Sequence, residues 1–486
     1  MAGRNAAAAG QPCDVIIIGA GIYGIQSART YLEIHPSANV VILEASNSIG
    51  GVWSPERVYD AFWTQTPLGI LGFSDQEMHH VAKDECYYDF FKAKHVSAYL
   101  RRYCDNHVYN GISIRDRVIM HSNVTGVHKE DGEWRILCND GKQEYRSRCL
   151  FDASGLTSTP NWPNLPDKDK FTGRILHHVD FAAFEREQPS GQEKPKRIAV
   201  MGGAKSAADV AYSCAKAGME VTWIIRRSGS GPAALVSAKG AYGYKNSNEL
   251  SYTRVTSLFI SSIFSPAMGY SWLINWLNQS RPGQWIMRKL WAQSQDEAAQ
   301  EADYDRPDGK ANGFHLLKPD TELFWQNDST GVNQRKDFFD IIARKVKVVR
   351  EDISHLDGDS ISMVPPSDPS LVFLGKLMLG NHFRDAEIQS LFACAVVDGR
   401  AKLLDRPSME YDIARKTVWC RRRYLRKGLS GNWFYWDTIP YHDDLLAHLG
   451  LSSHRGRSWT QDLFRPAFSK DLAGLLPEYK SSPGKA

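Results

Sequence analysis

The sequence predicts an α/β protein with two parallel sheets, each entered through a strand, a glycine-rich turn and a helix. The first unit begins at Asp14, where the apolar run Val15–Ile18 precedes glycines and a helical pattern to about Leu32. The second begins at Arg197, where "RIAVMGGAKSAADV" has the same order. A short apolar run before glycines is typical of a buried parallel strand. With 486 residues, the chain is long enough for two or three domains.

Two further stretches have a clear secondary-structure pattern. The residues "YYDFFKAKHVSAYLRRYCDNH", 87–107, predict a helix. Residues 114–150 predict short strands in a meander, because Asp-Gly turns at Asp131 and Asp140 separate apolar runs.

The first glycine-rich turn matches the pattern GxGxxG and consists of Gly19, Ala20, Gly21, Ile22, Tyr23 and Gly24. In such a turn the first glycine allows the tight bend, the second lets backbone amides approach a pyrophosphate, and the third lets helix and strand pack closely. The next strand, "ANVVILEAS", ends in Glu44, which is placed to accept a hydrogen bond from a ribose hydroxyl. This combination predicts an FAD site.

The second turn is "GGAKSA", residues 202–207, with Ala204 where the pattern usually has its second glycine. The following strand, "EVTWIIRR", ends in Arg226 and Arg227 instead of an acid. Guanidinium groups bind a 2′-phosphate, which a carboxylate would repel. The turn therefore favours NADPH, and the alternative is a pair of solvated arginines on an ordinary βαβ unit. Two nucleotide sites in one chain imply hydride transfer from one cofactor to the other.

A third motif narrows the class of nucleotide-binding protein that the two turns indicate. Residues 171–181, "FTGRILHHVDF", match FxGxxxHxxx[FY], and "GGVW" at 50–53 and "DASG" at 152–155 follow the order of a known family. With the two turns, they resemble the flavin-containing monooxygenases, class B flavoprotein monooxygenases, and especially their fungal FAD-dependent members. The segments "DPSLVFLG" and "EIQSLFACAVVDG" extend the resemblance over most of the chain.

The resemblance implies two Rossmann-like dinucleotide-binding domains, with the NADPH domain inserted into a discontinuous FAD domain. We expect the first part of the FAD domain at 1–165, the NADPH domain with an aromatic-rich insertion at 166–365, and the second part of the FAD domain with C-terminal helices at 366–486.

The resemblance also implies an activity. NADPH would reduce FAD, the reduced flavin would take up O₂ as a C4a-hydroperoxide, and a soft nitrogen or sulfur centre of a small-molecule substrate would accept one oxygen atom. No nucleophilic side chain is required. The protein would exclude water and hold the nicotinamide over the flavin.

Site residues follow from the motif positions. The resemblance assigns FAD to Gly19–Tyr23, Glu44, Val52, Trp53, Gln65 and Thr66. It assigns NADP(H) to Thr64, Gln65, Ser206, Ala207, Ala208 and Asp209, to which the charge argument adds Arg226 and Arg227. Gln65 stands where the family has its active-site asparagine, so it is the candidate catalytic residue.

Phe181 fits the family motif and disfavours the related Baeyer–Villiger monooxygenases, which usually have tryptophan at this position. Other positions depart from the family and leave alternatives open. Ala182 replaces the usual Lys, Asp or Pro, and Gln65 replaces the active-site asparagine. The family's second ATG[YW] segment is missing, because "DGDSISMVPPSDPS", 357–370, joins the flanking segments directly. The alternatives are a Baeyer–Villiger monooxygenase and a catalytically impaired FAD-binding protein or scaffold. A flavin disulfide reductase is disfavoured, since no two of the eight cysteines have CxxC spacing.

Composition and short patterns bear on binding partners and location. A formal net charge of +4 does not indicate nucleic-acid binding. Scattered cysteines and the lack of a signal peptide predict a cytoplasmic protein. The uncharged stretch 255–280 is long enough to span a bilayer, but Pro266 and Gly269 favour buried helices or a channel wall over membrane association. The histidine pairs at 79–80 and 177–178 do not predict a metal site, because neighbours on an extended strand point to opposite faces. The sequence gives no indication of oligomeric state.

Overall fold

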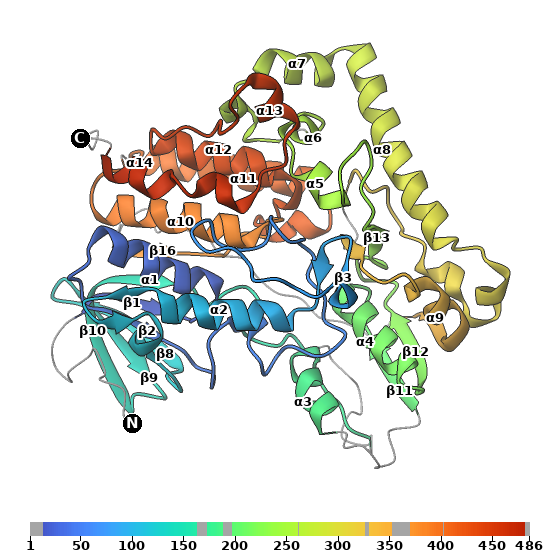
Figure 1. Cartoon of the computed structure of the whole chain (residues 1–486), viewed down its shortest axis with the longest axis horizontal. Helices are drawn as coiled ribbons and strands as arrows, with labels where there is room; N and C mark the ends of the chain where they lie inside the picture. The colour runs from blue at the N-terminus through green and yellow to red at the C-terminus, as the bar shows by residue number, and fades with distance from the viewer. Residues whose placement is uncertain are drawn as a thin grey trace.

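A computed structural model describes residues 13–162, 173–187, 197–260, 262–325, 330–351, 370–401 and 403–481. Figure 1 shows two sheets at the lower part of the molecule and a group of helices above them. The two strand–turn–helix units expected near Asp14 and Arg197 are confirmed, one in each sheet.

The first sheet has seven strands in the order β7-β2-β1-β10-β9-β8, and β16 also pairs with β10. Its parallel part consists of β1 (Cys13–Ile18), β2 (Val40–Leu43), β7 (Val118–Ile119), β10 (Gln143–Asp152) and β16 (Leu371–Phe373). β8 (Val124–Glu130) and β9 (Glu133–Cys138) continue it as an antiparallel meander, as predicted for this part of the chain. Strand β16 therefore brings a segment from the last quarter of the chain into the sheet built by the first third.

The second sheet is smaller. It consists of β11 (Arg197–Met201), β12 (Glu220–Ile225) and β15 (Val346–Arg350), all parallel, with β12 in the middle. Helices α4 (Lys205–Lys216) and α9 (Phe338–Lys345) pack together beside it, and their apolar residues form a core with the inner strand positions. A separate pair of parallel strands consists of β13 (Ala234–Ser237) and β14 (Thr330–Asn333), and β13 packs against α8.

Helices cover the first sheet. Helix α1 (Ile22–Ile34) packs along α10 (His382–Val397), and α2 (Lys94–Asn106) contributes to the same core. The C-terminal helices α11 (Arg406–Arg423), α12 (Thr438–His448), α13 (Trp459–Phe464) and α14 (Leu475–Ser481) follow α10, and all but α13 share a second apolar core with it. Shorter elements are β3 (Cys86–Tyr87), β4 (Phe90–Phe91), β5 (Val108–Tyr109), β6 (Ile112–Ser113) and α3 (Phe181–Arg186).

The uncharged stretch 255–280 is broken into short elements. Helices α5 (Ser247–Ser251) and α6 (Arg254–Leu258) precede a 3₁₀ turn that contains Pro266, and Gly269 follows with a φ of 76°. Helices α7 (Ser271–Gln279) and α8 (Arg281–Ala302) then form a bent pair. In the part of the chain that the structure describes, no helix is long and apolar enough to cross a membrane.

The helix predicted from residue 87 begins later. Cys86–Tyr87 and Phe90–Phe91 form a hairpin, and α2 starts at Lys94. Tyr88 and Asp89 at the hairpin turn have φ angles of 49° and 66°, which suit a tight two-residue hairpin turn and interrupt a helix. The connection 357–370, apart from Ser370, lies outside the described residues, and so do the first two residues of the "FTGRILHHVDF" motif.

Glycine is required where the first turn meets its strand. A Cβ atom on Gly24 would lie 1.8 Å from the carbonyl oxygen of Gly19, so Gly24→Ala forces the turn and helix α1 apart. We expect this substitution to lower the free energy of unfolding by about 3 kcal/mol, the upper range for overpacking. Urea denaturation of Gly24→Ala measures it. The control is Gly474→Ala, because a Cβ there meets no atom within 4 Å. Equal stability of the two variants would contradict the proposed tight packing.

Candidate cofactor-binding site

The start of α1 is open to a ligand. Gly21 is the N-cap of this helix, and no side chain caps it. A Cβ on Gly21 would meet only the Cα of Gly51, at 3.9 Å, so the backbone here has free space on its outer side. Uncapped amides at a helix N-terminus attract anions. The residues present therefore fit a pyrophosphate.

The acid after β2 lies against the same turn. Glu44 is buried, and its Oε2 accepts a hydrogen bond from the backbone N–H of Ala20 at 2.7 Å. Its Oε1 accepts from the backbone N–H of Ser46 at 2.8 Å. These two hydrogen bonds fix Glu44 beside the glycines, where its carboxylate could accept a hydrogen bond from a ribose hydroxyl.

The "GGVW" segment packs on the glycine turn. Gly50 and Gly51 have φ angles of 117° and 58°, and a Cβ on Gly51 would come within 3.3 Å of the Cα of Gly21. Trp53 stacks on Phe62 with ring centroids 5.3 Å apart. Val52 is exposed. The structure thus brings "GGVW" and GxGxxG together.

Two residues of the last part of the chain join this site, and the sequence did not single them out. The Tyr23 hydroxyl pairs with Nδ1 of His382, the first residue of α10, at 2.9 Å. Burial lowers the pKa of His382 to about 4, so its imidazole is neutral. The Lys376 ammonium donates to Oγ of Ser154 at 2.8 Å and pairs with Asp152 at 3.2 Å. The position of Lys376, directly after the "VFLG" strand end, was the available signal.

The second turn has a matching geometry. Ala204 is the N-cap of α4, and again no side chain caps the helix. Ser206 is exposed at its first turn, Ala207 is half-buried and Ala208 is buried. A Cβ on Gly203 would lie 2.2 Å from the carbonyl oxygen of Gly231, so this glycine is needed for packing. The start of α4 is therefore also open to an anion.

A buried charge cluster follows in α4. Asp209 pairs with the Lys205 ammonium at 2.5 Å and with Nη1 of Arg335 at 2.7 Å. All three side chains are largely buried. Burial lowers the pKa of Lys205 to about 8, while the Asp209 carboxylate opposes that shift. The carboxylate of Asp209, predicted to contact NADP(H), is thus engaged within the protein.

The two arginines after β12 differ. Both are exposed, but Nε of Arg227 donates to the carbonyl oxygen of Arg350 at 2.7 Å. Within the described ranges, neither Arg226 nor Arg227 forms an ion pair with a carboxylate. Because Arg226 is exposed, an external phosphate can reach its guanidinium.

Gln65 lies between the two nucleotide-type units. Its Oε1 accepts from the backbone N–H of Val332 in β14 at 2.8 Å, and its carbonyl oxygen accepts from Nδ2 of Asn248 at 2.7 Å. A Cβ on Gly331 would lie 3.3 Å from this Oε1 and 3.2 Å from Cδ of Lys205, which places the second turn beside Gln65. The amide nitrogen Nε2 is buried and has no hydrogen-bond partner among the described residues. A buried unpaired donor costs about 1–3 kcal/mol, so it marks a place where a partner is expected.

The threonines on either side of Gln65 are held by the protein. Thr64 is fully buried, and its hydroxyl oxygen accepts from the backbone N–H of Phe91 at 3.2 Å. Its carbonyl oxygen accepts from Nε2 of Gln334 at 2.8 Å. The Thr66 hydroxyl interacts with the hydroxyl of Tyr252. These contacts fix the backbone around Gln65.

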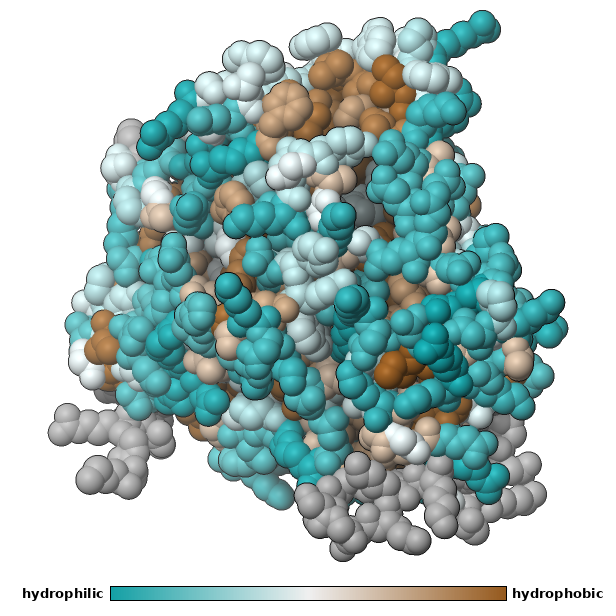
Figure 2. All heavy atoms as spheres, turned by 45° about the vertical axis from the view of Figure 1, so that its right-hand side comes forward, coloured by the Kyte–Doolittle hydropathy of each residue, from teal (hydrophilic) through white to brown (hydrophobic). Residues whose placement is uncertain are grey.

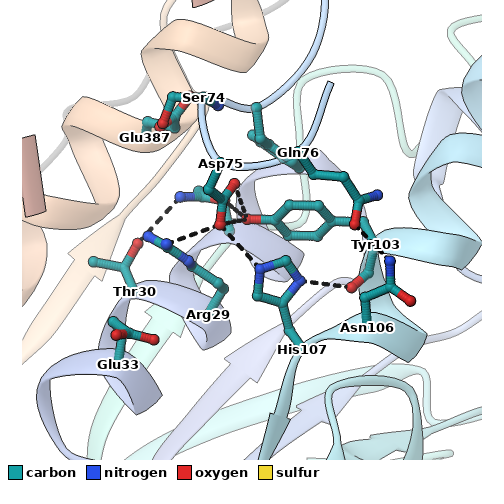
Figure 3. A network of polar contacts seen from close by, with 12 residues as sticks. Arg29, Thr30, Glu33, Ser74, Asp75, Gln76, Tyr103, Asn106, His107 and Glu387 are labelled. Carbon is teal, nitrogen blue, oxygen red and sulfur yellow. Dashed lines mark hydrogen bonds and ion pairs between the residues drawn. The ribbon is translucent and has the colours of Figure 1, made fainter. Parts of the chain in front are cut away.

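A second polar cluster lies away from Gln65 and fixes α1 to α2. Figure 3 shows Arg29, Tyr103 and His107 pointing toward the carboxylate of Asp75, at 2.8, 3.0 and 2.9 Å. Burial opposes ionisation of Asp75, but His107 and Arg29 keep its pKa below the usual value. Each charged group of this cluster has a partner, which is typical of a structural network.

Comparison with known proteins agrees with this geometry. A family model described as pyridine nucleotide-disulphide oxidoreductase matches residues 16–239, which include both turns. The "FAD-dependent monooxygenase resA" of Aspergillus sclerotiorum is 25% identical over 582 aligned positions, covering 96% of this chain and 98% of that protein. The "FAD-dependent monooxygenase DEP4" of Fusarium langsethiae is 24% identical and covers 96% and 95% of the two chains.

Solved structures share the fold. A steroid monooxygenase bound to NADP has a TM-score of 0.61 at 15% identity and covers 90% of this chain and 98% of that one. The S-allyl-L-cysteine S-oxygenase of Allium sativum has a TM-score of 0.53 at 17% identity, covering 97% and 95%.

The chain is therefore homologous to fungal FAD-dependent monooxygenases over nearly all of its residues, and the resemblance to flavin-containing monooxygenases is confirmed. All eight cysteines are free. The 582 aligned positions exceed the 486 residues of this chain, so the relative carries segments that this chain lacks.

The depressed pKa of Lys205 predicts a pH dependence of stability. A lysine whose folded pKa of about 8 lies below its unfolded value binds fewer protons when folded, so it adds stability as pH rises above 8. Between pH 8 and about pH 9.5, the wild type should gain about 1.5 kcal/mol relative to Lys205→Met. Urea midpoints at the two pH values measure this difference.

The control for this measurement is Lys216→Met in the same helix. Hydrogen bonds to Tyr212 and Asp337 raise the pKa of Lys216, so its loss should not alter the gain over this pH interval. Parallel pH profiles for wild type and Lys205→Met would contradict the buried position of the Lys205 ammonium.

Proposed function

We propose that this protein is an FAD- and NADPH-dependent monooxygenase that transfers one oxygen atom from O₂ to a soft nitrogen or sulfur centre of a small molecule. The observation that carries the proposal is the unpaired buried amide of Gln65 between two open nucleotide-type turns. The homology to FAD-dependent monooxygenases over nearly the whole chain supports it.

The first turn is proposed to hold FAD. Backbone amides at the start of α1 would bind its pyrophosphate, and Glu44 would accept from a ribose hydroxyl. Val52, Trp53 and Thr66 would contact the flavin. The turn itself consists of Gly19, Ala20, Gly21, Ile22, Tyr23 and Gly24. FAD supplies the redox and oxygen chemistry when it is bound.

The second turn is proposed to hold NADPH. The start of α4, with Ser206 and Ala207, would bind the pyrophosphate, and Arg226 would bind the 2′-phosphate. We assign Ala208 and Asp209 a supporting role, because both are buried and Asp209 is paired with Arg335. Arg227 would help to position the loop through its hydrogen bond to Arg350.

Gln65 is proposed to act as a hydrogen-bond donor toward the reacting region. Its Oε1 is fixed by Val332, so rotation of the amide is restrained and Nε2 keeps a defined direction. Thr64, with its backbone and hydroxyl both satisfied, would help to exclude water from this region.

The proposed domains are 1–165 and 366–486 for FAD and 166–365 for NADPH. Support comes from β16, which pairs with β10 in the first sheet, while β11, β12 and β15 form a sheet of their own. We also propose a cytoplasmic location, supported by the eight free thiols.

The test uses purified protein loaded with FAD, NADPH and ¹⁸O₂, with a panel of a tertiary amine, a thioether and a cyclic ketone. Incorporation of one labelled oxygen into the amine or thioether is the expected result. Labelled lactone from the ketone alone would instead support a Baeyer–Villiger enzyme. Bound FAD without NADPH consumption would overturn the proposal in favour of a catalytically impaired protein.

Gly21 offers a direct test of the FAD assignment. The Gly21→Ala methyl group has room in the protein, 3.9 Å from the nearest atom, but it would enter the space assigned to the pyrophosphate. We expect normal stability with a loss of bound FAD. The ratio of flavin to protein absorbance after purification measures it. Unchanged occupancy would place FAD elsewhere.

Arg226→Ala should weaken NADPH binding and leave NADH nearly unaffected. A charge-assisted contact to the 2′-phosphate contributes about 1.5–3 kcal/mol, which is about tenfold or more in affinity. Titration of the FAD-loaded protein with each nucleotide measures the two dissociation constants. Arg227→Ala is the matched comparison, with a smaller expected effect, because its Nε is already bound to Arg350. An equal loss for NADPH and NADH in Arg226→Ala would assign this arginine to structure.

A further inference from the structure

One end of the molecule carries large aromatic side chains that the fold leaves in solvent. They lie on α7, α8 and α13, and we call them the aromatic end. The exposed fractions are 73% for Trp272, 43% for Trp276, 58% for Trp285, 70% for Trp459 and 49% for Phe464. In Figure 1, α7 and α13 lie beside each other at the top of the molecule, and α8 descends from α7. Exposed aromatic groups of this size mark an interaction surface.

The core does not require these side chains. The inward faces of the same helices already fill an apolar cluster with Ile274, Leu277, Met287 and Leu463. Trp272 and Trp276 are four residues apart, so both point away from that cluster on one face of α7. The Tyr270 hydroxyl donates to Asp462 at 3.4 Å, which ties α13 to the start of α7. The aromatic end is thus a fixed surface.

The charges around these aromatic groups are positive. The sequence has no Asp or Glu between residues 250 and 295. Arg281, Trp285, Arg288 and Lys289 follow one another at helical spacing along α8, and all four are exposed. Acidic residues begin only at Asp296, toward the other end of the helix.

Arginines also line a hollow on α13. This hollow has a volume of about 520 Å³ and is lined by Arg457, Thr460, Gln461, Phe464 and Arg465. Arg465 is paired with Asp471, whereas Arg457 forms no ion pair within the described part of the chain. Figure 2 shows apolar side chains gathered at the same upper end, bordered by polar ones.

We propose that the aromatic end docks onto the surface of an anionic lipid bilayer. Tryptophan is favoured at the boundary between headgroups and acyl chains, because its ring is apolar and its N–H is polar. Arginine and lysine beside it are attracted to anionic headgroups, and the hollow with Arg457 fits a phosphate group. The described helices do not cross a membrane, so the protein would lie on the surface.

Charge argues against a second copy as the occupant. A two-fold symmetric contact places the same surface on both subunits, so the cations of one aromatic end would face those of the other. The sequence between residues 250 and 295 has no carboxylate that would compensate Arg281, Arg288 and Lys289. This inference does not depend on the proposed function.

The test is sedimentation of the whole, FAD-loaded chain with vesicles. One set contains phosphatidylcholine with phosphatidylserine, and the other contains phosphatidylcholine alone. We expect binding to the first set, little binding to the second, and release at high salt. No binding to the phosphatidylserine vesicles would overturn the proposal.

Two groups of variants separate the contributions of the tryptophans and of the cations to vesicle binding. The combined substitution Trp272→Ser, Trp276→Ser and Trp285→Ser should lower the partition coefficient at least tenfold. Arg281→Gln, Arg288→Gln and Lys289→Gln together should lower it about a hundredfold, at about fivefold for each cation. The second group keeps the tryptophans, so it remains informative if the first does not fold.

Controls remove one exposed tryptophan and three exposed cations elsewhere. Trp162→Ser removes a tryptophan with 45% exposure whose ring lies beside His177. Arg344→Gln, Lys345→Gln and Lys347→Gln together remove three exposed cations from α9 and β15. Both controls should bind vesicles as the wild type does. Equal losses in the controls, a tryptophan-dependent dimer without vesicle binding, or competition by an oligonucleotide that abolishes vesicle binding would each contradict docking on lipid.

Discussion

The buried guanidinium of Arg335 joins the two halves of the proposed site. Its Nη1 pairs with Asp209 in α4 at 2.7 Å, and its Nη2 donates to the carbonyl oxygen of Ala61. The guanidinium also lies 4.7 Å from the ring centroid of Tyr212. A buried charge is costly without partners, so separating α4 from the segment before Gln65 would leave the Arg335 guanidinium unpaired. These contacts therefore hold α4 against that segment. The relative position of the two glycine-rich turns depends on this joint.

The position of Gln65 follows from the same region. Arg335 comes two residues after β14, where the backbone N–H of Val332 donates to Oε1 of Gln65 and restrains its amide. Gln334 binds the carbonyl oxygen of Thr64 at 2.8 Å. Three hydrogen bonds thus join residues 61–65 to residues 332–335. A proposed hydride transfer between two cofactors needs such rigidity, since small misplacements of reacting groups are costly in rate.

Short sequence motifs predicted the first glycine-rich turn and the elements that flank it. The GxGxxG turn, its strand and Glu44 are fixed by short-range rules of backbone conformation and packing, and the structure has them where they were expected. The hairpin before α2 was missed, because positive φ angles at Tyr88 and Asp89 depend on tertiary context. Arg335 and Lys376 were also missed. Their partners lie more than one hundred residues away in the sequence, so no local pattern indicates these contacts, although Lys376 directly follows the "VFLG" strand end.

The most direct test of this account is the rate at which NADPH reduces the bound flavin when oxygen is excluded, compared between wild type and Arg335→Met. Arg344→Met on α9 is the control, since Arg344 is exposed and pairs only with Asp308 among the described carboxylates. If Arg335 holds the two nucleotide sites in register, Arg335→Met should retain FAD but reduce it about 100-fold more slowly, while the control matches the wild type. Equal rates in all three proteins, or a wild type that NADPH does not reduce, would contradict the account.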